Sequence, residues 1–453
     1  MADSTCKRSI DPETSQPMQD RKKRKAAAKE KKKGFGEEIL QETNYYIENG
    51  LRHIRPYNFT FTTHAKGRWV GKKLIDIFKN EFSSSPVEYY INAIQNGKIT
   101  VNNKIPSANT IVRDNDVIRN TVHRHEPPVT ANPIQIIKMD DDIVVINKPA
   151  SIPVHPCGRY RHNSVVFMLA RDYGLQNLHT IHRLDRLTSG ILIFARTLQK
   201  AQELEKQVRD RQIEKQYVCR VDGEFPTETI DCKEPIDVVS HKLGVCRVSP
   251  KGKSCQTIFQ RLSYNGKTSL VKCIPLTGRM HQIRVHLQWL GYPIVNDPIY
   301  NHEAWGPNKG KAGHIDKDVD SIVLTLLQFH RHDNVIPKQV DEIKNLDSVD
   351  ELDKDNSSSS SQNCENISQV RQHQDNKSES HITTEKIQAS EDVNQSPMVS
   401  PLENNVHQDC VECRLTYKDP TPEEMVLWLH ALKYKGPDWE FEAKLPEWSL
   451  DNL

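Results

Sequence analysis

The sequence predicts an α+β fold in which a larger domain carries a mixed, largely antiparallel sheet and a small α/β unit precedes it. Between residues 134 and 300, short apolar runs typical of strands alternate with amphipathic helical stretches, as in domains that pack helices on a sheet. Between residues 67 and 122, two helical patterns lead into a hairpin pattern. The rest is polar enough to predict disorder, since 36% of all residues are hydrophobic and 27% are charged,.

The polar segments differ in charge, although the formal net charge is +2. Residues 21–33 read RKKRKAAAKEKKK, which predicts a disordered basic tail. Such a run is a nuclear localisation signal, an RNA contact or simply a solvated lysine-rich tail. Residues 307–408 are rich in Ser, Asn, Asp, Glu and Gln, which predicts a disordered acidic insert. Its functional alternatives are binding of a protein partner and phosphorylation.

Targeting and redox signals point to the inside of the cell. The ten cysteines are scattered without a dense framework and no signal-peptide pattern precedes them, so we expect reduced thiols. No apolar run approaches the roughly 18 residues of a membrane span. The first residues, MADSTCKRSIDPETSQ, contain Asp and Glu, which argues against a mitochondrial transit peptide. We therefore expect the nucleus or the cytoplasm rather than the mitochondrion, and no membrane partner.

The small unit is expected to be a helix–helix–hairpin arrangement. In GRWVGKKLIDIFKNEF, a helical phase puts Val70, Leu74, Ile77 and Phe78 on one face,. SSSP then ends this helix and caps a second one, VEYYINAIQNG, whose Gly97 suits a C-terminal stop,. KITVNNKIP predicts a hairpin that turns at its two asparagines,. Lysine and arginine lie on the polar face of this unit, which suits contact with nucleic acid.

The larger domain is expected to begin with a buried strand in DDIVVINK, followed by the loop PASIPVHP. The next elements are a helix in SVVFMLARDYG, a strand in GILIFART, a charged helix in LQKAQELEKQVRDRQ and a strand in EKQYVCRVDGEF,. TSLVKCIPLTGRMHQIRVHLQWLGYP predicts a strand, a turn and a helix that ends at Gly291,. Order is expected to resume near Cys410, which indicates an insertion within one domain.

The stretch HRLDRLTSG at 182–190 carries the strongest chemical signal. It places Asp185 between Arg183 and Arg186, directly before a Thr-Ser-Gly turn and an apolar strand. Neighbouring guanidinium groups lower the pKa of a carboxyl, so we expect Asp185 to be ionised at neutral pH. A rigidly held carboxylate suits nucleophilic attack or stabilisation of an oxocarbenium-like centre. The competing interpretation is an ion-paired aspartate that organises a loop.

Other candidate groups lie in TGRMHQIRVHL and KQYVCRVDG. Arg279 and Arg284 are available for a buried carboxylate or a phosphate,. His281 and His286 are expected to pack or to form hydrogen bonds, because no third metal ligand has a suitable spacing,. Tyr217 is either a core aromatic or a stacking platform for a base,.

No metal and no cofactor are expected. Cys410 and Cys413 form a CxxC pair without a second cysteine pair, so a structural role is favoured. The sequence also contains no glycine-rich phosphate loop and no H-x-E … P-C-x-x-C deaminase pattern,.

Four motifs in this chain resemble the RluA-type RNA pseudouridine synthases. HRLDRLTSGILIFART resembles the family signature, NKPASIPVHP its upstream loop, EKQYVCRVDG its tyrosine-bearing strand and PLTGRMHQIRVHLQWLGYPIVND its arginine-bearing motif. The 67–122 unit resembles an S4-like RNA-binding domain. The expected divisions are a basic tail at 1–40, an N-terminal extension at 41–66, the S4-like unit at 67–125, the catalytic domain at 126–306, the insert at 307–408 and the C-terminal part of the catalytic domain at 409–453.

The resemblance implies an isomerase that detaches uracil from ribose, rotates it and rejoins it through C5. It implies that Asp185 attacks C1′ or the uracil ring, or supports a glycal route. Tyr217 would pack on the base, and whether it also helps to remove the C5 proton stays open. Arg284 would pair with Asp185. The implied RNA- or substrate-binding residues are Arg183, Arg186, Asn147, Lys148, His155, Arg279 and His281. This chemistry needs no redox carrier, ATP or metal.

The implied partner is RNA, bound by a monomer. Extruding a uridine costs least in loops and single strands, so loop uridines are favoured. The resemblance implies uridines of the transfer RNA anticodon stem-loop first and of messenger RNA second. One alternative is a catalytically silent RNA-binding protein on the same scaffold. A phosphodiester-cleaving enzyme or a glycosidase is a second alternative. A retaining glycosidase would need another carboxylate close to the first, and these motifs offer none beside Asp185.

Overall fold

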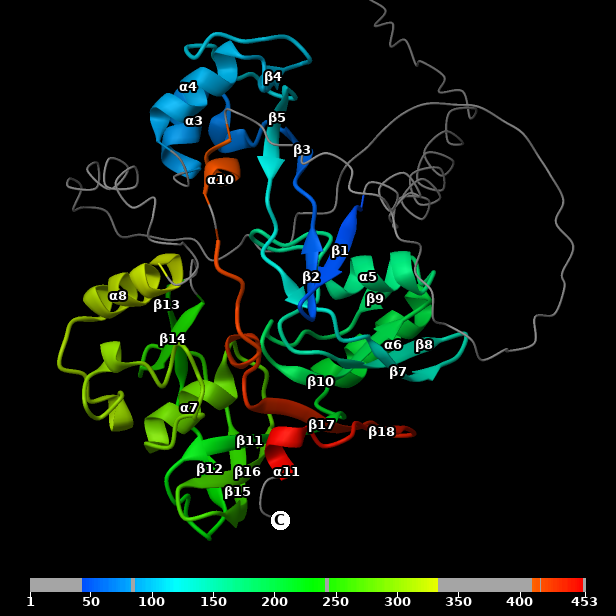
Figure 1. Ribbon diagram of the computed structural model, residues 1–453, viewed down its shortest axis with the longest axis vertical. Coiled ribbons are helices and arrows are strands. Elements are labelled where there is room, and N and C mark those ends of the chain that lie inside the picture. Colours follow the sequence, from blue (N-terminus) through cyan, green and yellow to red (C-terminus); the bar gives the residue numbers. More distant parts are fainter. Residues whose placement is uncertain (1–42, 83–85, 241–243, 333–409, 416, 451–453) are drawn as a thin grey trace, which may run out of the picture. The chain divides into compact units, whose positions relative to one another are not determined.

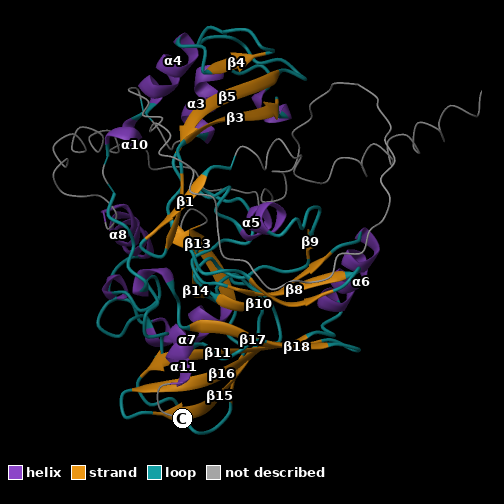
Figure 2. Ribbon diagram, turned by 45° about the vertical axis from the view of Figure 1, so that its right-hand side comes forward, coloured by secondary structure: helices purple, strands orange, loops and turns teal. Residues whose placement is uncertain are grey.

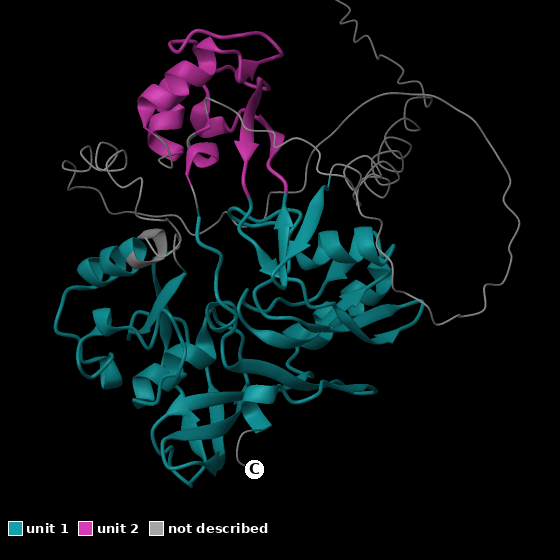
Figure 3. Cartoon of the chain, viewed as in Figure 1, with its two compact units in different colours: residues 1–54, 126–335, 417–453 teal, residues 55–125, 336–416 magenta. Residues whose placement is uncertain are grey.

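The computed structural model describes residues 43–82, 86–240, 244–332, 410–415 and 417–450. Two compact units divide the chain, a larger unit of residues 1–54, 126–335 and 417–453 and a smaller unit of residues 55–125 and 336–416 (Figure 3). The predicted basic tail at 1–40 and residues 333–408 of the predicted acidic insert lie outside the described residues.

A ten-stranded sheet is the frame of the larger unit (Figures 1 and 2). Its strands are β7 (Gln135–Met139), β8 (Ile143–Lys148), β9 (His179–Thr180), β10 (Ser189–Ala195), β11 (Glu214–Asp222), β12 (Ile230–Cys232), β15 (Thr257–Tyr264), β16 (Thr268–Pro275), β17 (Leu429–Lys435) and β18 (Glu440–Glu442). The order is β12-β15-β16-β11-β17-β10-β8-β7, with β18 beside β17 and β9 beside β10. Neighbouring strands are antiparallel except β10 and β17, so the predicted mixed, largely antiparallel sheet is confirmed.

A glycine brings β10 and β17 together. Gly190 has a φ of +109°, and a Cβ at this position would lie 2.3 Å from the carbonyl oxygen of Ala431, a contact that no other residue could make without moving the backbone. Next to it, Ser189 Oγ lies 2.8 Å from His430 Nδ1. The Thr-Ser-Gly stretch after Asp185 therefore lets β17 pair with β10 directly beside the loop that carries this aspartate.

Helices cover both faces of the sheet. On one face, α5 (Val165–Asp172) packs Phe167 against β8 and β10, and on the other, α6 (Leu198–Arg209) packs Leu204 against the same strands. This accounts for the continuous apolar run of β8, because a strand covered on both sides has no polar face. α7 (Gln282–Leu290) packs on β11, β15 and β16 through a separate cluster.

The fold continues past residue 307, where the predicted insert begins. α8 (Val319–His332) buries Ile322 and Leu326 completely, in a cluster that includes Val285 of α7 and Tyr300. These two residues are four positions apart and share one helical face. The prediction of disorder is wrong for residues 307–332, because the apolar side chains of α8 pack into this cluster.

The smaller unit combines a three-stranded sheet with two helices. The strands β3 (Tyr57–His64), β5 (Val117–Arg124) and β4 (Ile99–Val101) pair in that order, and the helices are α3 (Leu74–Glu81) and α4 (Val87–Gln95). The apolar faces of both helices pack on the sheet around a buried core that includes Trp69, Leu74, Phe78, Tyr90 and Ile94.

Two details of this unit differ from the prediction. The unit begins at Arg55 rather than at residue 67, because β3 pairs with β5 along its whole length. Val70 lies before the helix and is 42% exposed, since Gly71 has a φ of +83° and the helix starts only at Leu74. The hairpin does turn at the two asparagines, which both adopt positive φ.

The remaining described elements are β1 (Tyr45–Glu48), β2 (Leu51–Ile54), β6 (Val129–Thr130), β13 (Ile236–Ser240), β14 (Val245–Val248), α10 (Val411–Arg414), α11 (Glu447–Leu450) and short 3-10 turns at Gly67–Trp69, Glu303–Trp305, Lys311–Gly313 and Glu423–Met425. β1, β2 and β6 form a sheet of three, and β13 pairs with β14. α10 belongs to the smaller unit, whereas the prediction assigned residues 409–453 to the larger domain. None of the described helices has the length and apolar character needed to span a membrane.

Candidate active site

Asp185 lies in the loop between β9 and β10. Its carbonyl accepts a hydrogen bond from the N–H of Thr188 at 3.1 Å, which closes the turn before β10. Lys148, at the end of β8, donates from Nζ to the carbonyl of Arg186 at 3.1 Å and to two carbonyls of the loop that follows β8. Lys148 therefore joins the loop that carries Asp185 to a second loop.

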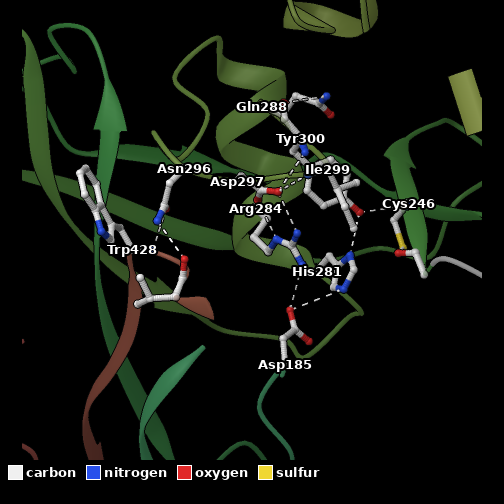
Figure 4. Close-up of polar contacts among 12 residues, drawn as sticks. Asp185, Cys246, His281, Arg284, Gln288, Asn296, Asp297, Ile299, Tyr300 and Trp428 are labelled. Atoms are coloured by element: carbon white, nitrogen blue, oxygen red, sulfur yellow. Dashed lines mark hydrogen bonds and ion pairs between the residues drawn. The ribbon is translucent and has the colours of Figure 1, made fainter. Parts of the chain in front are cut away.

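The carboxylate of Asp185 faces a buried arginine on α7 (Figure 4). Arg284 donates from Nη1 to Asp185 Oδ2 at 3.3 Å and from Nε and Nη2 to the two oxygens of Asp297, at 2.7 and 2.8 Å. Asp297 is itself held by the N–H groups of Ile299 and Tyr300, both at 2.9 Å to Oδ1. This two-pronged pairing fixes the plane of the guanidinium and leaves its Nη1 group to face Asp185.

A histidine contacts the same carboxylate oxygen. His281 precedes α7 in the left-handed conformation, with a φ of 55°, and its Nε2 lies 3.6 Å from Asp185 Oδ2. Its Nδ1 lies 2.9 Å from the hydroxyl of Tyr300, which accepts a hydrogen bond from the N–H of Cys246 at 3.0 Å. The arrangement in which Tyr300 donates to Nδ1 leaves the ring proton on Nε2, pointing at the carboxylate.

The charges keep Asp185 ionised at neutral pH. Burial raises the pKa of its carboxyl, but His281, Arg284 and, to a smaller extent, Arg183 hold the pKa below 3.8. Burial and Arg284 lower the pKa of His281 to about 4, so its ring is neutral at pH 7 and Arg284 supplies the permanent charge. The predicted ionisation agrees with this, but the groups that lower the pKa most, His281 and Arg284, come from another part of the chain, and the flanking Arg183 contributes less. One third of the Asp185 side chain, 33%, remains exposed.

Tyr217 comes from β11, at a point where the register with β17 shifts between Gln216 and Tyr217. Its hydroxyl lies 2.5 Å from the hydroxyl of the buried Tyr434. Burial raises the pKa of Tyr217 to about 12, the hydrogen bond to Tyr434 lowers it, and the negative charge of Asp185 raises it further. The phenol is therefore protonated at neutral pH and lies within the electrostatic reach of Asp185.

Three of the other predicted residues lie on or near the loop that carries Asp185. Arg183 is exposed, and the guanidinium of Arg186 lies 5.6 Å from the centre of the Tyr160 ring. His155 is exposed on the loop after β8, and local burial and then Arg183 lower the pKa of its imidazole. This side of the site thus presents two arginines and a histidine to an incoming anion.

Three predicted RNA-binding residues are engaged within the protein. Lys148 is fully buried, with its ammonium bonded to three carbonyls, so it positions loops and does not face RNA, and its predicted contact role is corrected. Asn147 donates to Gln135 at 3.4 Å along the sheet. Arg279 is exposed at the turn before α7, with its guanidinium bonded to the carbonyl of Ser254.

Sequence reasoning did not assign a role to Asp297, Tyr300 or Tyr434. Asp297 ends the motif PIVND, and its neighbour Asn296 bonds the backbone of Val426 and Trp428 at 2.9 Å each (Figure 4). The expectation that Arg284 meets a buried carboxylate was the available signal for Asp297. Tyr434 has no local signal, because it lies 217 positions from its partner Tyr217.

The arrangement offers an ionised carboxylate with one oxygen committed and the other open. Both contacts to Arg284 and His281 use Oδ2. A partly exposed anion on a rigid loop, beside an aromatic ring, suits attack on an electrophilic carbon or removal of a proton.

Comparisons with known proteins agree with this geometry. Residues 142–289, which contain Asp185, Tyr217 and Arg284, match the family described as RNA pseudouridylate synthase. The chain is 47% identical over 424 residues to Pseudouridylate synthase RPUSD2 of Homo sapiens, which covers 92% of this chain and 77% of that protein. It is 38% identical over 433 residues to the tRNA pseudouridine(32) synthase, mitochondrial, of Saccharomyces cerevisiae, covering 92% and 81% of the two chains. It is 30% identical over 456 residues to the tRNA pseudouridine(31) synthase of the same yeast, covering 90% and 98%.

Proposed function

Because the chain belongs to the RluA-type RNA pseudouridylate synthases and is an isomerase of that kind, we propose that Asp185 is its catalytic residue and that transfer RNA is its substrate. One observation carries the assignment of Asp185. Its carboxylate is ionised, lies 3.3 Å from the buried guanidinium of Arg284 and keeps 33% of its side chain exposed. An aspartate that only organised a loop would not need an open face.

In the proposed reaction the N1–C1′ bond of uridine breaks, the uracil rotates and a C5–C1′ bond forms. C5 then loses its proton and N1 gains one, so the product has the composition of the substrate and nothing is oxidised. Attack of Asp185 on C1′, its addition to the uracil ring and a glycal route all require the carboxylate form. Oδ1 is the oxygen proposed to meet the substrate, since Oδ2 faces Arg284 and His281.

Arg284 and His281 are proposed to prepare Asp185. The guanidinium holds the pKa of the carboxyl low without moving, because Asp297 fixes its plane through two hydrogen bonds. Such a fixed charge costs no reorganisation when the reaction begins. His281, neutral at pH 7, adds an N–H toward the same oxygen and constrains its direction.

Tyr217 is proposed to pack on the target base with its ring. Its hydroxyl already lies 2.5 Å from that of Tyr434, and the pKa of about 12 keeps it protonated. A protonated phenol is a poor acceptor for the C5 proton at neutral pH. The ring face remains the useful part, because stacking is how proteins commonly hold an extruded base.

RNA affinity is proposed to come from both units. At the site, Arg183 and Arg186 provide positive charge for the phosphates on either side of the extruded uridine. In the smaller unit, which we propose acts as an S4-like RNA-binding domain, a polar hollow is lined by Lys98, Asn103 and Arg119 among others. Affinity of this kind falls as salt rises, since it depends on release of counterions.

Transfer RNA is proposed first because two relatives carry it in their names, as synthases of tRNA pseudouridine 32 and tRNA pseudouridine 31. Uridines of the anticodon stem-loop are the specific proposal, and messenger RNA loops are the second candidate. We propose the nucleus or the cytoplasm as the compartment, and the basic run at 21–33 supports the nucleus. Microscopy of a fluorescent fusion of the full chain tests this.

The decisive experiment measures tritium release from 5-tritiated uridine in transfer RNA transcripts, because formation of the C5–C1′ bond frees the hydrogen of C5. The full-length Asp185→Asn protein should bind the transcript like the wild type but release no tritium above background. Asp141→Asn is the matched control, since Asp141 is fully exposed and lies outside the site, and it should react at the wild-type rate.

Each other result has a definite meaning. Tritium release by Asp185→Asn at the wild-type rate would refute the catalytic assignment. A wild-type protein that binds RNA and releases nothing from transfer RNA or messenger RNA transcripts would support a silent RNA-binding protein. Free uracil in the supernatant would identify a glycosidase. Release from messenger RNA loops alone would overturn the choice of substrate while leaving the role of Asp185 intact.

A further inference from the structure

Four side chains of the smaller unit meet at one point, far from the proposed catalytic aspartate in sequence. They are His123, His125, Cys410 and Cys413, here called the His–Cys cluster, and one nitrogen or sulfur atom of each lies within 4.8 Å of the others. Of the groups of three or more His, Cys, Asp or Glu side chains in the described residues, this is the one close enough to share a metal ion. All four side chains are partly buried.

Four of the six separations within the His–Cys cluster match those of ligands around one tetrahedral ion. His123 Nδ1 lies 3.3 Å from His125 Nε2, and Cys413 Sγ lies 3.3 Å from each of these nitrogens. Cys410 Sγ lies 3.5 Å from His125 Nε2. With Zn–N near 2.0–2.1 Å and Zn–S near 2.3 Å, tetrahedral geometry puts ligand atoms about 3.3–3.8 Å apart.

Local structure explains how each pair converges. His123 lies in β5 and His125 directly follows it, and residues two positions apart on a strand point to the same side. Cys410 caps the short helix α10 and Cys413 lies within it, so a single turn brings the two sulfurs together.

We propose that His123, His125, Cys410 and Cys413 bind one Zn²⁺ ion. Two thiolates and two imidazoles form a set that zinc favours over the oxygen-seeking Mg²⁺ and Ca²⁺. Because all four positions come from protein, the ion has no open place for a substrate, so the site is structural. The proposal does not depend on the proposed catalytic function.

The ion would fasten two distant parts of the chain. Cys413 and His123 are 290 positions apart, and β5 would be joined to the segment that follows the predicted insert. His125 is the last residue of the smaller unit before the chain enters the larger one, and the chain returns to the larger unit after residue 416. Zinc would thus close a long loop between residues 125 and 410. Closure of a long loop removes more conformational entropy from the unfolded chain than closure of a short one, so the ion would stabilise the fold.

The test uses the full-length protein expressed with added zinc and purified in metal-free buffer, with metal measured by plasma mass spectrometry. The wild type should retain one zinc ion per chain, and Cys413→Ser should lose it. Cys413→His, which keeps four ligands, should retain it. Cys157→Ser is the control, since Cys157 is exposed and outside the His–Cys cluster, and its zinc content should equal that of the wild type.

Cobalt substitution of the wild type keeps the test independent of how well the variants fold. Co²⁺ in the wild type should give intense visible bands of a tetrahedral site and a near-ultraviolet thiolate band, and in Cys413→His the thiolate band should fall to about half. Wild-type protein without stoichiometric zinc, a cobalt spectrum without the thiolate band, or equal zinc in Cys413→Ser and Cys157→Ser would each overturn the proposal.

Discussion

Replacing Asp297 by asparagine should test whether the buried ion pair sets up the site. Asp297 has a fully buried side chain, and it binds Arg284 through two hydrogen bonds of 2.7 and 2.8 Å. The asparagine side chain would keep the shape but lose the charge, and its amide would turn N–H groups toward a guanidinium that can only donate. Removing one partner of a buried, hydrogen-bonded pair costs about 3–5 kcal/mol, and we expect that decrease in the free energy of unfolding.

The rate of reaction should also fall, through Asp185. Without the carboxylate of Asp297, the plane of the Arg284 guanidinium is no longer fixed. Of these two aspartates, Asp185 is then the one that still offers Arg284 a carboxylate. A displacement of the carboxylate by about 1 Å costs on the order of 100-fold in rate. Single-turnover tritium release measures this loss, and affinity for RNA should stay unchanged.

The control is Glu224→Gln in the same unit. Glu224 pairs with Arg261 at 2.9 Å but is 62% exposed, and exposed pairs contribute about 0–1 kcal/mol. Urea unfolding of both variants gives the comparison. If Asp297→Asn were no less stable than Glu224→Gln and modified RNA at the wild-type rate, the buried pair would not be what positions Asp185.

Three other predictions follow from the same contacts. Burial raises the pKa of Asp297, but Arg284 and two backbone N–H groups hold it below 3.8, so its stabilisation is present above about pH 4 and is lost as the pH falls through the folded value. Urea titrations should therefore show the difference between wild type and Asp297→Asn shrinking below about pH 4. Gly190→Ala should lower the free energy of unfolding by about 1–3 kcal/mol through overlap with the β17 backbone,, whereas Gly278→Ala, whose Cβ meets open space, should unfold like the wild type. Tyr217→Phe should keep most of the tritium release, and Tyr217→Ala should lose it. A Tyr217→Phe protein that releases no tritium would show that the hydroxyl takes part in the reaction.

The sequence located elements whose signal is local. The apolar run of β8, the strand β10 and the charged amphipathic helix α6 were all predicted at their places, because side-chain periodicity is set by neighbours in the chain,. The same holds for the stop of α7 at Gly291, which adopts a φ of 87°. The strand β3 was not predicted, because it is defined by its pairing with β5, which lies about 60 residues further along the chain.

Site residues divide along the same line. Asp185, Tyr217 and Arg284 were identified from motifs, each within its own short stretch. Lys148 was misassigned, because a lysine in a loop motif looks like an RNA contact until the fold encloses it.

By itself, therefore, the sequence determined the class of the fold and the elements around the candidate site, and it gave Asp185 as the candidate at its centre. Only the tertiary structure decided that Arg284 is held by Asp297, that Tyr217 meets Tyr434, and that two histidines join the CxxC pair. These partners lie in different elements, and the order of strands in a sheet depends on how the whole core is buried rather than on any spacing along the chain.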